Sequence, residues 1–320
     1  MHLKKSILLL LLCSSIYSHA AFVQHDGKWS DSRYIPTLTL TEHYDVGYRN
    51  FQDNQWYEAL RNFLTILIHF PDSPFQADAI FYSGVCYYFL EEYDLANVQF
   101  DRYIRMGTTP KHFESAFEFK FHIAERFANK GTMKHPMGLQ IFPKIAFATK
   151  GDALKIYDEV IAALPSHELA IKALFGKGNL HMKQGEDKES IDVFQTLARR
   201  FPKHTLAADS YLLISEIYLN QSEMEAQDPD VCSLAQINLR KFQSHFPGDE
   251  RIAQSEENLH IMKGYFAASL FKTGRYYERK KKPKASVIYY REAVNRFPKT
   301  EHAQKSEERL KVLEKALAKA

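Results

Sequence analysis

Histidine, lysine and serine are the side chains that could do catalytic chemistry in this sequence, and their spacing matches no catalytic motif. His167 is followed by Glu168, as in the zinc-protease motif H-E-x-x-H, but the second histidine is missing. Gly176-Lys177-Gly178 lacks the G-x-x-x-x-G-K-S/T spacing of a phosphate-binding loop. The G-x-S-x-G motif of serine hydrolases does not occur. The sequence therefore predicts no enzyme, no metal site and no cofactor.

The densest charge is the basic run Arg279-Lys280-Lys281-Lys282-Pro283-Lys284. It falls at a turn between two predicted helices, where lysines are usually solvated. We interpret it as an exposed turn, and the alternative is a surface for an anionic partner or lipid headgroup. The whole chain has a formal charge of only +3, which gives no reason to predict nucleic-acid binding.

Residues 1–20 have the anatomy of a secretory signal peptide. Lys4 and Lys5 precede a short apolar core, and Ser18-His19-Ala20 predicts cleavage after Ala20. The alternative is a lipid anchor on Cys13, which directly follows the apolar core. That core is far shorter than the ~20 residues needed to span a bilayer, so we expect an exported protein that is soluble or lipid-anchored.

Two cysteines, Cys86 and Cys232, remain once the signal peptide is removed. Export permits a disulfide, but two distant cysteines form no disulfide framework. Both fall in helical patterns, so we expect small, buried, apolar thiols.

Helical periodicity begins at Thr41 and is interrupted by a recurring stop, an apolar residue followed by proline. Because proline cannot continue a helix, each stop predicts a helix end. The stops are Phe70-Pro71, Leu164-Pro165, Phe201-Pro202, Phe246-Pro247 and Phe297-Pro298.

The segments before the stops share one internal spacing. Gly47, Ala59 and Phe63 are spaced as Gly84, Ala96 and Phe100, and as Gly178, Ser190 and Phe194. Small residues suit the closest approach of two paired helices, and an aromatic side chain fills the space beside them. This pattern is typical of a helix–turn–helix repeat of about 34 residues.

These residues resemble the tetratricopeptide (TPR) family. The resemblance implies an all-α fold, a right-handed solenoid of about five to six helix pairs with a C-terminal capping helix. An extended lead-in would occupy 21–40, and a turn-rich insertion at 130–150 would split the third pair. Across 41–320, the predicted elements are the pairs 41–71, 77–108, 113–165, 170–202, 206–247 and 252–298, and a cap at 301–318.

In this family the first helix of each pair lines a groove that binds ligands. The resemblance places six residues of the first two pairs on that groove: Tyr44, Tyr48, Phe51, Phe81, Val85 and Tyr88. The same positions of the fourth pair are Phe175, Asn179 and Met182. An apolar groove implies an apolar or aromatic-rich extended ligand. The alternative is that this stripe belongs to the core, or that the lead-in covers it.

A narrower resemblance is to the BamD family of outer-membrane assembly lipoproteins. It is carried by residues 70–79 with Gly84 and Tyr87-Tyr88, by 239–247, and by the last repeat. It implies a periplasmic protein at the inner face of the outer membrane of a Gram-negative bacterium. Its partners would be the periplasmic domains of the barrel insertase and unfolded outer-membrane proteins. The alternative is a periplasmic TPR adaptor for cell-wall or envelope machinery.

Overall fold

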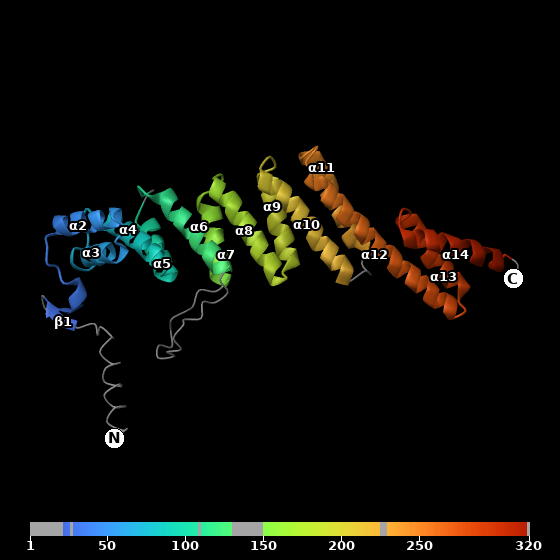
Figure 1. The fold of residues 1–320 in the computed structure, drawn as a ribbon, viewed down its shortest axis with the longest axis horizontal. Helices are drawn as coiled ribbons and strands as arrows, with labels where there is room; N and C mark the ends of the chain where they lie inside the picture. Colours follow the sequence, from blue (N-terminus) through green and yellow to red (C-terminus); the bar gives the residue numbers. More distant parts are fainter. Residues whose placement is uncertain (1–21, 26–27, 108–109, 130–149, 225–228, 319–320) are drawn as a thin grey trace, which may run out of the picture. The chain divides into compact units, whose positions relative to one another are not determined.

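A computed structural model of the chain describes residues 22–25, 28–107, 110–129, 150–224 and 229–318. These residues form thirteen α-helices, a short hairpin and a 3-10 turn, and the chain divides into two compact units, 1–156 and 157–320 (Figure 1). The predicted signal peptide, with Cys13 and Ala20, and nearly all of the insertion 130–150 lie outside the described residues. Among the described helices, none combines the length and apolarity needed to cross a membrane.

The lead-in begins with an antiparallel hairpin of β1 (Phe22–His25) and β2 (Lys28–Asp31), in which Phe22 lies opposite Asp31. The 3-10 turn η1 (Ser32–Tyr34) follows. The first helix starts after Thr39, whose hydroxyl accepts from the Glu42 N–H while the Glu42 carboxylate accepts from the Thr39 N–H. This capping box satisfies two backbone donors and fixes the helix start at Leu40.

Unit 1 packs its helices in chain order, each against the next. They are α2 (Leu40–Gln52), α3 (Trp56–His69), α4 (Gln76–Phe89), α5 (Tyr93–Ile104) and α6 (Phe113–Asn129). The division between the two units falls within α7 (Lys150–Ala163).

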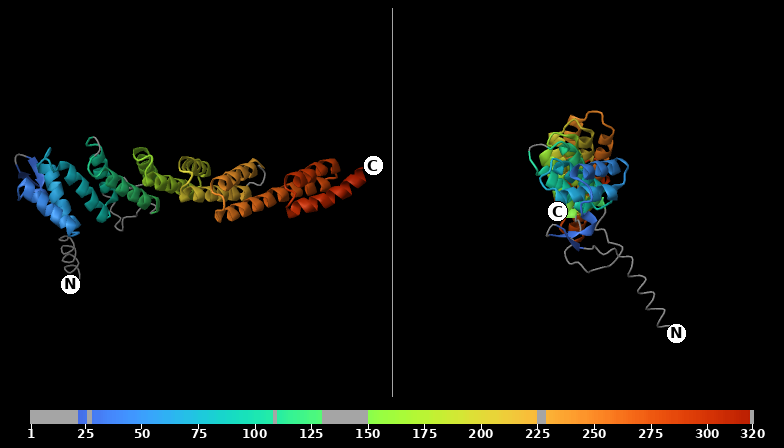
Figure 2. Two further views of the ribbon diagram at one scale, coloured as in Figure 1. Left: turned by 90° about the horizontal axis from the view of Figure 1, so that it is seen from above. Right: turned by 90° about the vertical axis from the view of Figure 1, so that its left-hand side faces the viewer.

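Unit 2 contains α8 (Glu168–Gln184), α9 (Asp187–Arg200), α10 (Thr205–Met224), α11 (Pro229–His245), α12 (Arg251–Arg279), α13 (Pro283–Arg296) and α14 (Glu301–Leu317). The long helix α12 packs against different helices along its two halves. Its first part, with Leu259 and Met262, enters the core shared with α10 and α11. Its second part packs on α13, and α14 lies beside α13 at the C-terminal end of the unit (Figure 2).

Four helix pairs are closed by the same glycine–aromatic contact. A Cβ atom on Gly84 would lie 2.9 Å from the Phe100 ring, and one on Gly178 would lie 2.5 Å from the Phe194 ring. A Cβ atom on Gly274 would lie 2.5 Å from the Tyr290 ring, and one on Gly47 would lie 3.0 Å from the Asn62 Cβ and 3.2 Å from the Phe63 ring. Real Cβ atoms are essentially never found closer than 3.0 Å to a neighbour, so only glycine fits at Gly84, Gly178 and Gly274 without a shift, while Gly47 is a tight fit. The spacing noticed in the sequence is therefore a packing contact.

The predicted apolar–proline stops are confirmed as helix ends. Phe70, Phe201 and Phe297 are the C-caps of α3, α9 and α13, with φ of −125°, −129° and −131°. In each, the cap N–H donates to the carbonyl four residues earlier, and the following proline prevents continuation.

Cys86 and Cys232 are free and buried, as expected. Burial raises the pKa of the Cys86 thiol to about 12 and also raises the pKa of Cys232. Both thiols therefore stay protonated at neutral pH and act as apolar core groups.

Candidate functional site

Aromatic side chains gather where α2 meets α4. Tyr44, Tyr48 and Phe51 follow one another along one face of α2 at four- and three-residue spacing. The Tyr44 and Tyr48 rings are parallel within 5°, with centroids 6.2 Å apart, and the Tyr48 and Phe51 centroids are 6.3 Å apart. All three rings are half-buried. The structure thus brings the three α2 residues of the predicted groove together.

Tyr82 is the ring of α4 that packs against this face. Its centroid lies 4.8 Å from that of Phe51 and 5.4 Å from that of Tyr48. Beyond Phe51, Trp56 continues the contact and stacks on Phe89 with ring centroids 4.3 Å apart. Phe89 is 48% exposed. We call Tyr44, Tyr48, Phe51, Trp56, Tyr82 and Phe89 the aromatic cluster.

Phe81 and Val85 do not line a groove, contrary to the prediction. Their exposed fractions are only 5% and 3%, and both belong to the core. The reason is the connection between α5 and α6, which lays the His112 ring flat on Phe81 at a centroid distance of 4.3 Å. Tyr103 of α5 also packs against Phe81, with ring centroids 5.3 Å apart.

Tyr88 lies in a neighbouring group of rings. Its centroid is 5.1 Å from that of Phe119 on α6 and 5.5 Å from that of Tyr93 on α5. It touches the aromatic cluster through Phe89, at 5.6 Å. In the fourth pair, Phe175 and Met182 are partly buried and pack against the core of unit 2. The six groove residues predicted in the first two pairs therefore lie in three places. Tyr44, Tyr48 and Phe51 lie in the aromatic cluster, Phe81 and Val85 in the core, and Tyr88 beside the rings of Phe119 and Tyr93.

Burial keeps the hydroxyl groups of Tyr44 and Tyr82 in the aromatic cluster uncharged. The Tyr44 hydroxyl donates to the Asp78 carboxylate at 3.0 Å, and burial raises the pKa of Tyr44. Burial also raises the pKa of Tyr82 to about 12. Asp78 lies 3.9 Å from Nε2 of His112, whose pKa is lowered by burial. Tyr44 and Tyr82 therefore stay neutral at neutral pH, and the cluster can bind by stacking and apolar contact.

The other candidate sites have structural roles. His167 Nδ1 accepts a hydrogen bond from the Leu169 N–H at the start of α8. Gly178 packs against the Phe194 ring of the paired helix α9. The buried Lys120 donates to the Asn97 side chain at 2.9 Å and pairs with Asp101, which ties α6 to α5. Among the described residues, no group of His, Cys, Asp and Glu could hold a metal ion.

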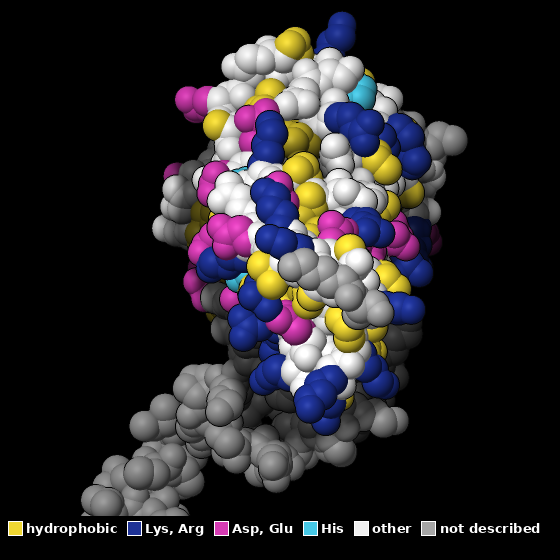
Figure 3. Space-filling view, turned by 90° about the vertical axis from the view of Figure 1, so that its right-hand side faces the viewer, with side chains coloured by type: hydrophobic (Ala, Val, Ile, Leu, Met, Phe, Trp, Pro, Cys, Tyr) yellow, Lys and Arg dark blue, Asp and Glu magenta, His cyan; other side chains and the backbone are white. Residues whose placement is uncertain are grey.

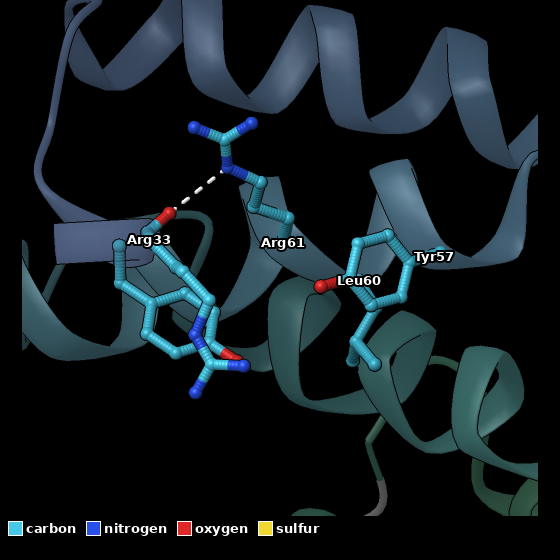
Figure 4. A pocket seen from close by; sticks show the side chains of 5 residues that line it. Arg33, Tyr57, Leu60 and Arg61 are labelled. Atoms are coloured by element: carbon cyan, nitrogen blue, oxygen red, sulfur yellow. Dashed lines mark hydrogen bonds between the residues drawn. The ribbon is translucent and has the colours of Figure 1, made fainter. Parts of the chain in front are cut away.

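The described lead-in packs on α3. The Arg61 side chain donates from Nε to the Arg33 carbonyl at 2.9 Å (Figure 4). Arg33, Tyr34, Tyr57, Leu60 and Arg61 enclose a hollow of about 190 Å³. Tyr34 therefore belongs to this hollow. The alternative that the lead-in covers the aromatic face stays a prediction.

The basic run is an exposed turn between α12 and α13. Lys281 has a φ of 56°, and the Lys280 ammonium lies 5.8 Å from the ring centroid of the half-exposed Tyr276. Lys and Arg side chains gather at the lower end of the C-terminal face in Figure 3, the end at which Figure 1 draws this turn. The turn was expected to be exposed, and binding of an anionic partner stays a prediction.

Two segments, 172–204 and 268–300, match the sequence model of the tetratricopeptide repeat. They contain the contacts Gly178–Phe194 and Gly274–Tyr290. No curated protein sequence matches the chain. These two segments are tetratricopeptide repeats, and the helix pairs of the described residues form the predicted all-α repeat fold, preceded by the short hairpin.

Solved structures that are similar to this chain include two TPR proteins and MamA. A TPR repeats protein from Bacteroides fragilis is 13% identical over 88% of this chain and 100% of its own, with a TM-score of 0.42. MamA is 14% identical over 68% of this chain and 92% of its own, with a TM-score of 0.39. YrrB, a TPR protein with an unusual peptide-binding site, is 14% identical over the same shares, with a TM-score of 0.38. Because these identities and TM-scores are low, the assignment to tetratricopeptide repeats rests on the two matched segments of the sequence.

Proposed function

We propose that this TPR protein is a non-enzymatic scaffold whose aromatic cluster binds apolar, aromatic-rich segments of partner proteins. The supporting observation is the stacked pair Trp56 and Phe89, which continues the half-buried rings of α2 out to a side chain that is 48% exposed. Aromatic residues are enriched at protein interfaces, where flat rings bury a large area at low entropic cost. Contiguous apolar surface on a soluble domain is usually functional.

The narrower proposal is a place in outer-membrane β-barrel assembly, and it rests on the BamD-like sequence words. The protein would act in the periplasm, at the inner face of the outer membrane. It would dock on the insertase and receive unfolded barrel precursors through the aromatic cluster. Membrane attachment would depend on whether Cys13 is lipidated or the signal peptide is cut after Ala20.

A peptide titration tests the aromatic cluster. The probe is a fluorescein-labelled peptide of alternating apolar and polar residues that ends in phenylalanine, compared with a copy ending in serine. We expect the first peptide to bind better, and Phe89→Ser to weaken its binding roughly tenfold, because an exposed aromatic anchor is lost. Phe89 is half exposed, so this change should leave the helical fold intact.

Tyr57→Ser is the matched control, because Tyr57 is an aromatic side chain of the first pair that is 59% exposed but lines the hollow on α3. Its binding should equal that of the unchanged protein. Equal binding by the Phe89 variant, or no preference for the phenylalanine ending, would refute the peptide-binding role.

Crosslinking in cells separates the two periplasmic assignments. A photoreactive residue in place of Phe89 should capture the barrel insertase or barrel precursors if the protein serves outer-membrane assembly. Capture of cell-wall enzymes would instead favour the second candidate, a periplasmic adaptor for envelope machinery. The same residue in place of Tyr57 should capture neither.

A further inference from the structure

Unit 2 contains a groove that the proposed function does not use. It lies between α9 and α11, the second helices of two successive pairs, and has a volume of about 510 Å³. Tyr211 and Tyr218 of α10 form its floor, and both are 5% exposed. The groove is thus built from three helices of one compact unit, whereas the aromatic cluster belongs to unit 1.

One wall of the groove carries large apolar side chains that are left in solvent. Leu234 and Ile237 of α11 are 47% and 44% exposed and lie one turn apart. The core side of the same helix is already occupied by Cys232, Ala235 and Leu239. Helix α11 therefore has two apolar sides, although a surface helix needs only one to pack on its core. The second side is what a partner would cover.

The rim of the groove is positively charged. Arg199 of α9 and Lys241 of α11 line it with His245, and Arg240 borders the adjoining hollow. None of the described residues that line the groove is Asp or Glu. The His245 Nδ1 and Tyr211 hydroxyl lie 3.2 Å apart, which places His245, one helical turn after Lys241, at the Tyr211 end of the floor.

Helix dipoles explain only part of this arrangement. Arg199 and Lys241 lie near the C-terminal ends of their helices, where cations interact favourably with the backbone. That effect does not require Leu234 and Ile237 to face the same groove. Apolar side chains beside cations are complementary to a segment that presents both apolar side chains and carboxylates.

We propose that this groove binds an acidic amphipathic helix of a partner protein. Apolar side chains of that helix would contact Leu234 and Ile237, and its carboxylates would pair with Arg199 and Lys241. The eight residues from Leu234 to Lys241 span about 10 Å, so an occupant of two to three helical turns matches the groove. Laying an amphipathic helix into an apolar groove is a recurring mode of recognition.

Charge also argues against an occupant from the chain itself. Segment 130–149 is apolar enough to be considered, but it carries Lys130, Lys134 and Lys144 and no Asp or Glu. Its positive charge would be repelled by Arg199 and Lys241. The groove therefore selects a segment of opposite charge.

Two synthetic helical peptides test the proposal with the full chain. Both carry leucines at the same helical spacing, and the remaining positions are glutamate in one and lysine in the other. In fluorescence anisotropy at low salt, the glutamate peptide should bind and the lysine peptide should not. Added salt should weaken the binding, because exposed ion pairs are screened. Binding of both peptides alike would overturn the proposal.

Four variants locate the binding site. Leu234→Ser with Ile237→Ser, and Arg199→Glu with Lys241→Glu, should each weaken glutamate-peptide binding roughly tenfold or more. Ile288→Ser and Lys311→Glu are the matched controls, since Ile288 is 63% exposed, the Lys311 side chain is 72% exposed, and they lie on α13 and α14, outside the groove. These controls should bind as the unchanged protein does. Unaltered binding by the groove variants would overturn the proposal.

Sedimentation measurements would distinguish a second copy of the chain from a separate partner as the occupant of the groove. If the protein dimerises and the Leu234→Ser, Ile237→Ser variant is a monomer, the groove is a homodimer interface and the proposal fails. A chain whose oligomeric state is the same with and without these changes supports a separate partner. The Phe89→Ser variant should still bind the glutamate peptide, so failure here is distinguishable from failure of the aromatic-cluster proposal.

Discussion

Glycine is used in this protein where the two helices of a pair come closest. Gly47, Gly84, Gly178 and Gly274 each precede, by sixteen residues, the aromatic ring that they contact. In two pairs a serine adds a hydrogen bond at the same place: Ser190 donates to the Gly178 carbonyl at 2.9 Å and Ser286 to the Gly274 carbonyl at 3.0 Å. Each contact therefore fixes both the distance and the register of its pair.

Gly178→Ala should destabilise the protein although alanine is the better helix former. The new Cβ would lie 2.5 Å from the Phe194 ring, which is fully buried and has no room to retreat. Overpacking of this kind costs about 1–3 kcal/mol. Urea unfolding followed by circular dichroism would measure the loss.

Gly264→Ala in α12 is the control for that change. No neighbouring atom lies within 4 Å of its Cβ position, so alanine should leave stability unchanged or raise it by up to about 1 kcal/mol. If both variants lose the same free energy of unfolding, the glycine–aromatic contact does not hold the pair together.

Residue spacing predicted these contacts well and the candidate site only partly. Glycine and its aromatic partner sit in adjacent helices joined by a short turn, so their contact is set by local sequence. The burial of Phe81 depends on His112, thirty-one residues away, and no helical period reports that contact. Tyr82, next to Phe81, makes the contact with α2, and Trp56 enters the cluster because the turn after α2 is short. In the sequence, only the aromatic character of Tyr82 and Trp56 points to a place in the cluster.

At the scale of whole elements, Arg251 fastens the start of α12 to α10. Its guanidinium contacts the Asp249 carboxylate at 2.6 Å and the Asp209 carboxylate of α10 at 2.5 Å. The hydrogen bond from Arg251 lowers the pKa of Asp249 below its ordinary value of 3.8. The same hydrogen bond raises the pKa of Arg251, which stays charged at every pH of interest.

Arg251→Gln should therefore reduce stability in a pH-dependent way. A carboxylate with a lowered folded-state pKa stabilises the protein above its ordinary pKa and loses that contribution as the pH falls through the lowered value. We expect the variant to be less stable by about 1 kcal/mol or less at pH 7, because the groups are partly exposed. The difference should shrink below pH 3.8. Denaturant titrations across this range would measure it.

Arg279→Gln removes the same charge from the exposed basic turn and serves as the control. It should show no comparable change between neutral and acid pH. A difference for Arg251→Gln that stays constant down to pH 3 would mean that the arginine acts by packing and not through Asp249.

The boundaries of the elements were predictable wherever a single residue type enforces them. Proline after Phe70, Phe201 and Phe297 ended the helices where expected. The 29 residues of α12 were harder to divide, because both of its parts share one helical period while packing on different neighbours. The hairpin before η1 carries no helical period and was foreseen only as extended chain.

On the scale of the molecule, contacts run between helices that are close in the chain. Within each unit, the main helix contacts of the described residues join elements that are at most two positions apart in chain order. Stability in such an array is approximately a sum of repeat terms and nearest-neighbour terms. A local change should therefore loosen its own repeat and the adjacent ones, and spare distant repeats.

Hydrogen exchange measured by mass spectrometry would test this with two matched variants. Gly84→Ala places a Cβ 2.9 Å from Phe100 in unit 1, and Gly274→Ala places one 2.5 Å from Tyr290 in unit 2. Each should speed amide exchange in its own pair and the neighbouring helices, because those amides exchange through local opening. Each should leave the far unit at the exchange rates of the unchanged protein, and Gly264→Ala should speed exchange in neither. Equal acceleration throughout the chain would instead mean that the two units unfold as one cooperative body, and that the repeats do not respond separately.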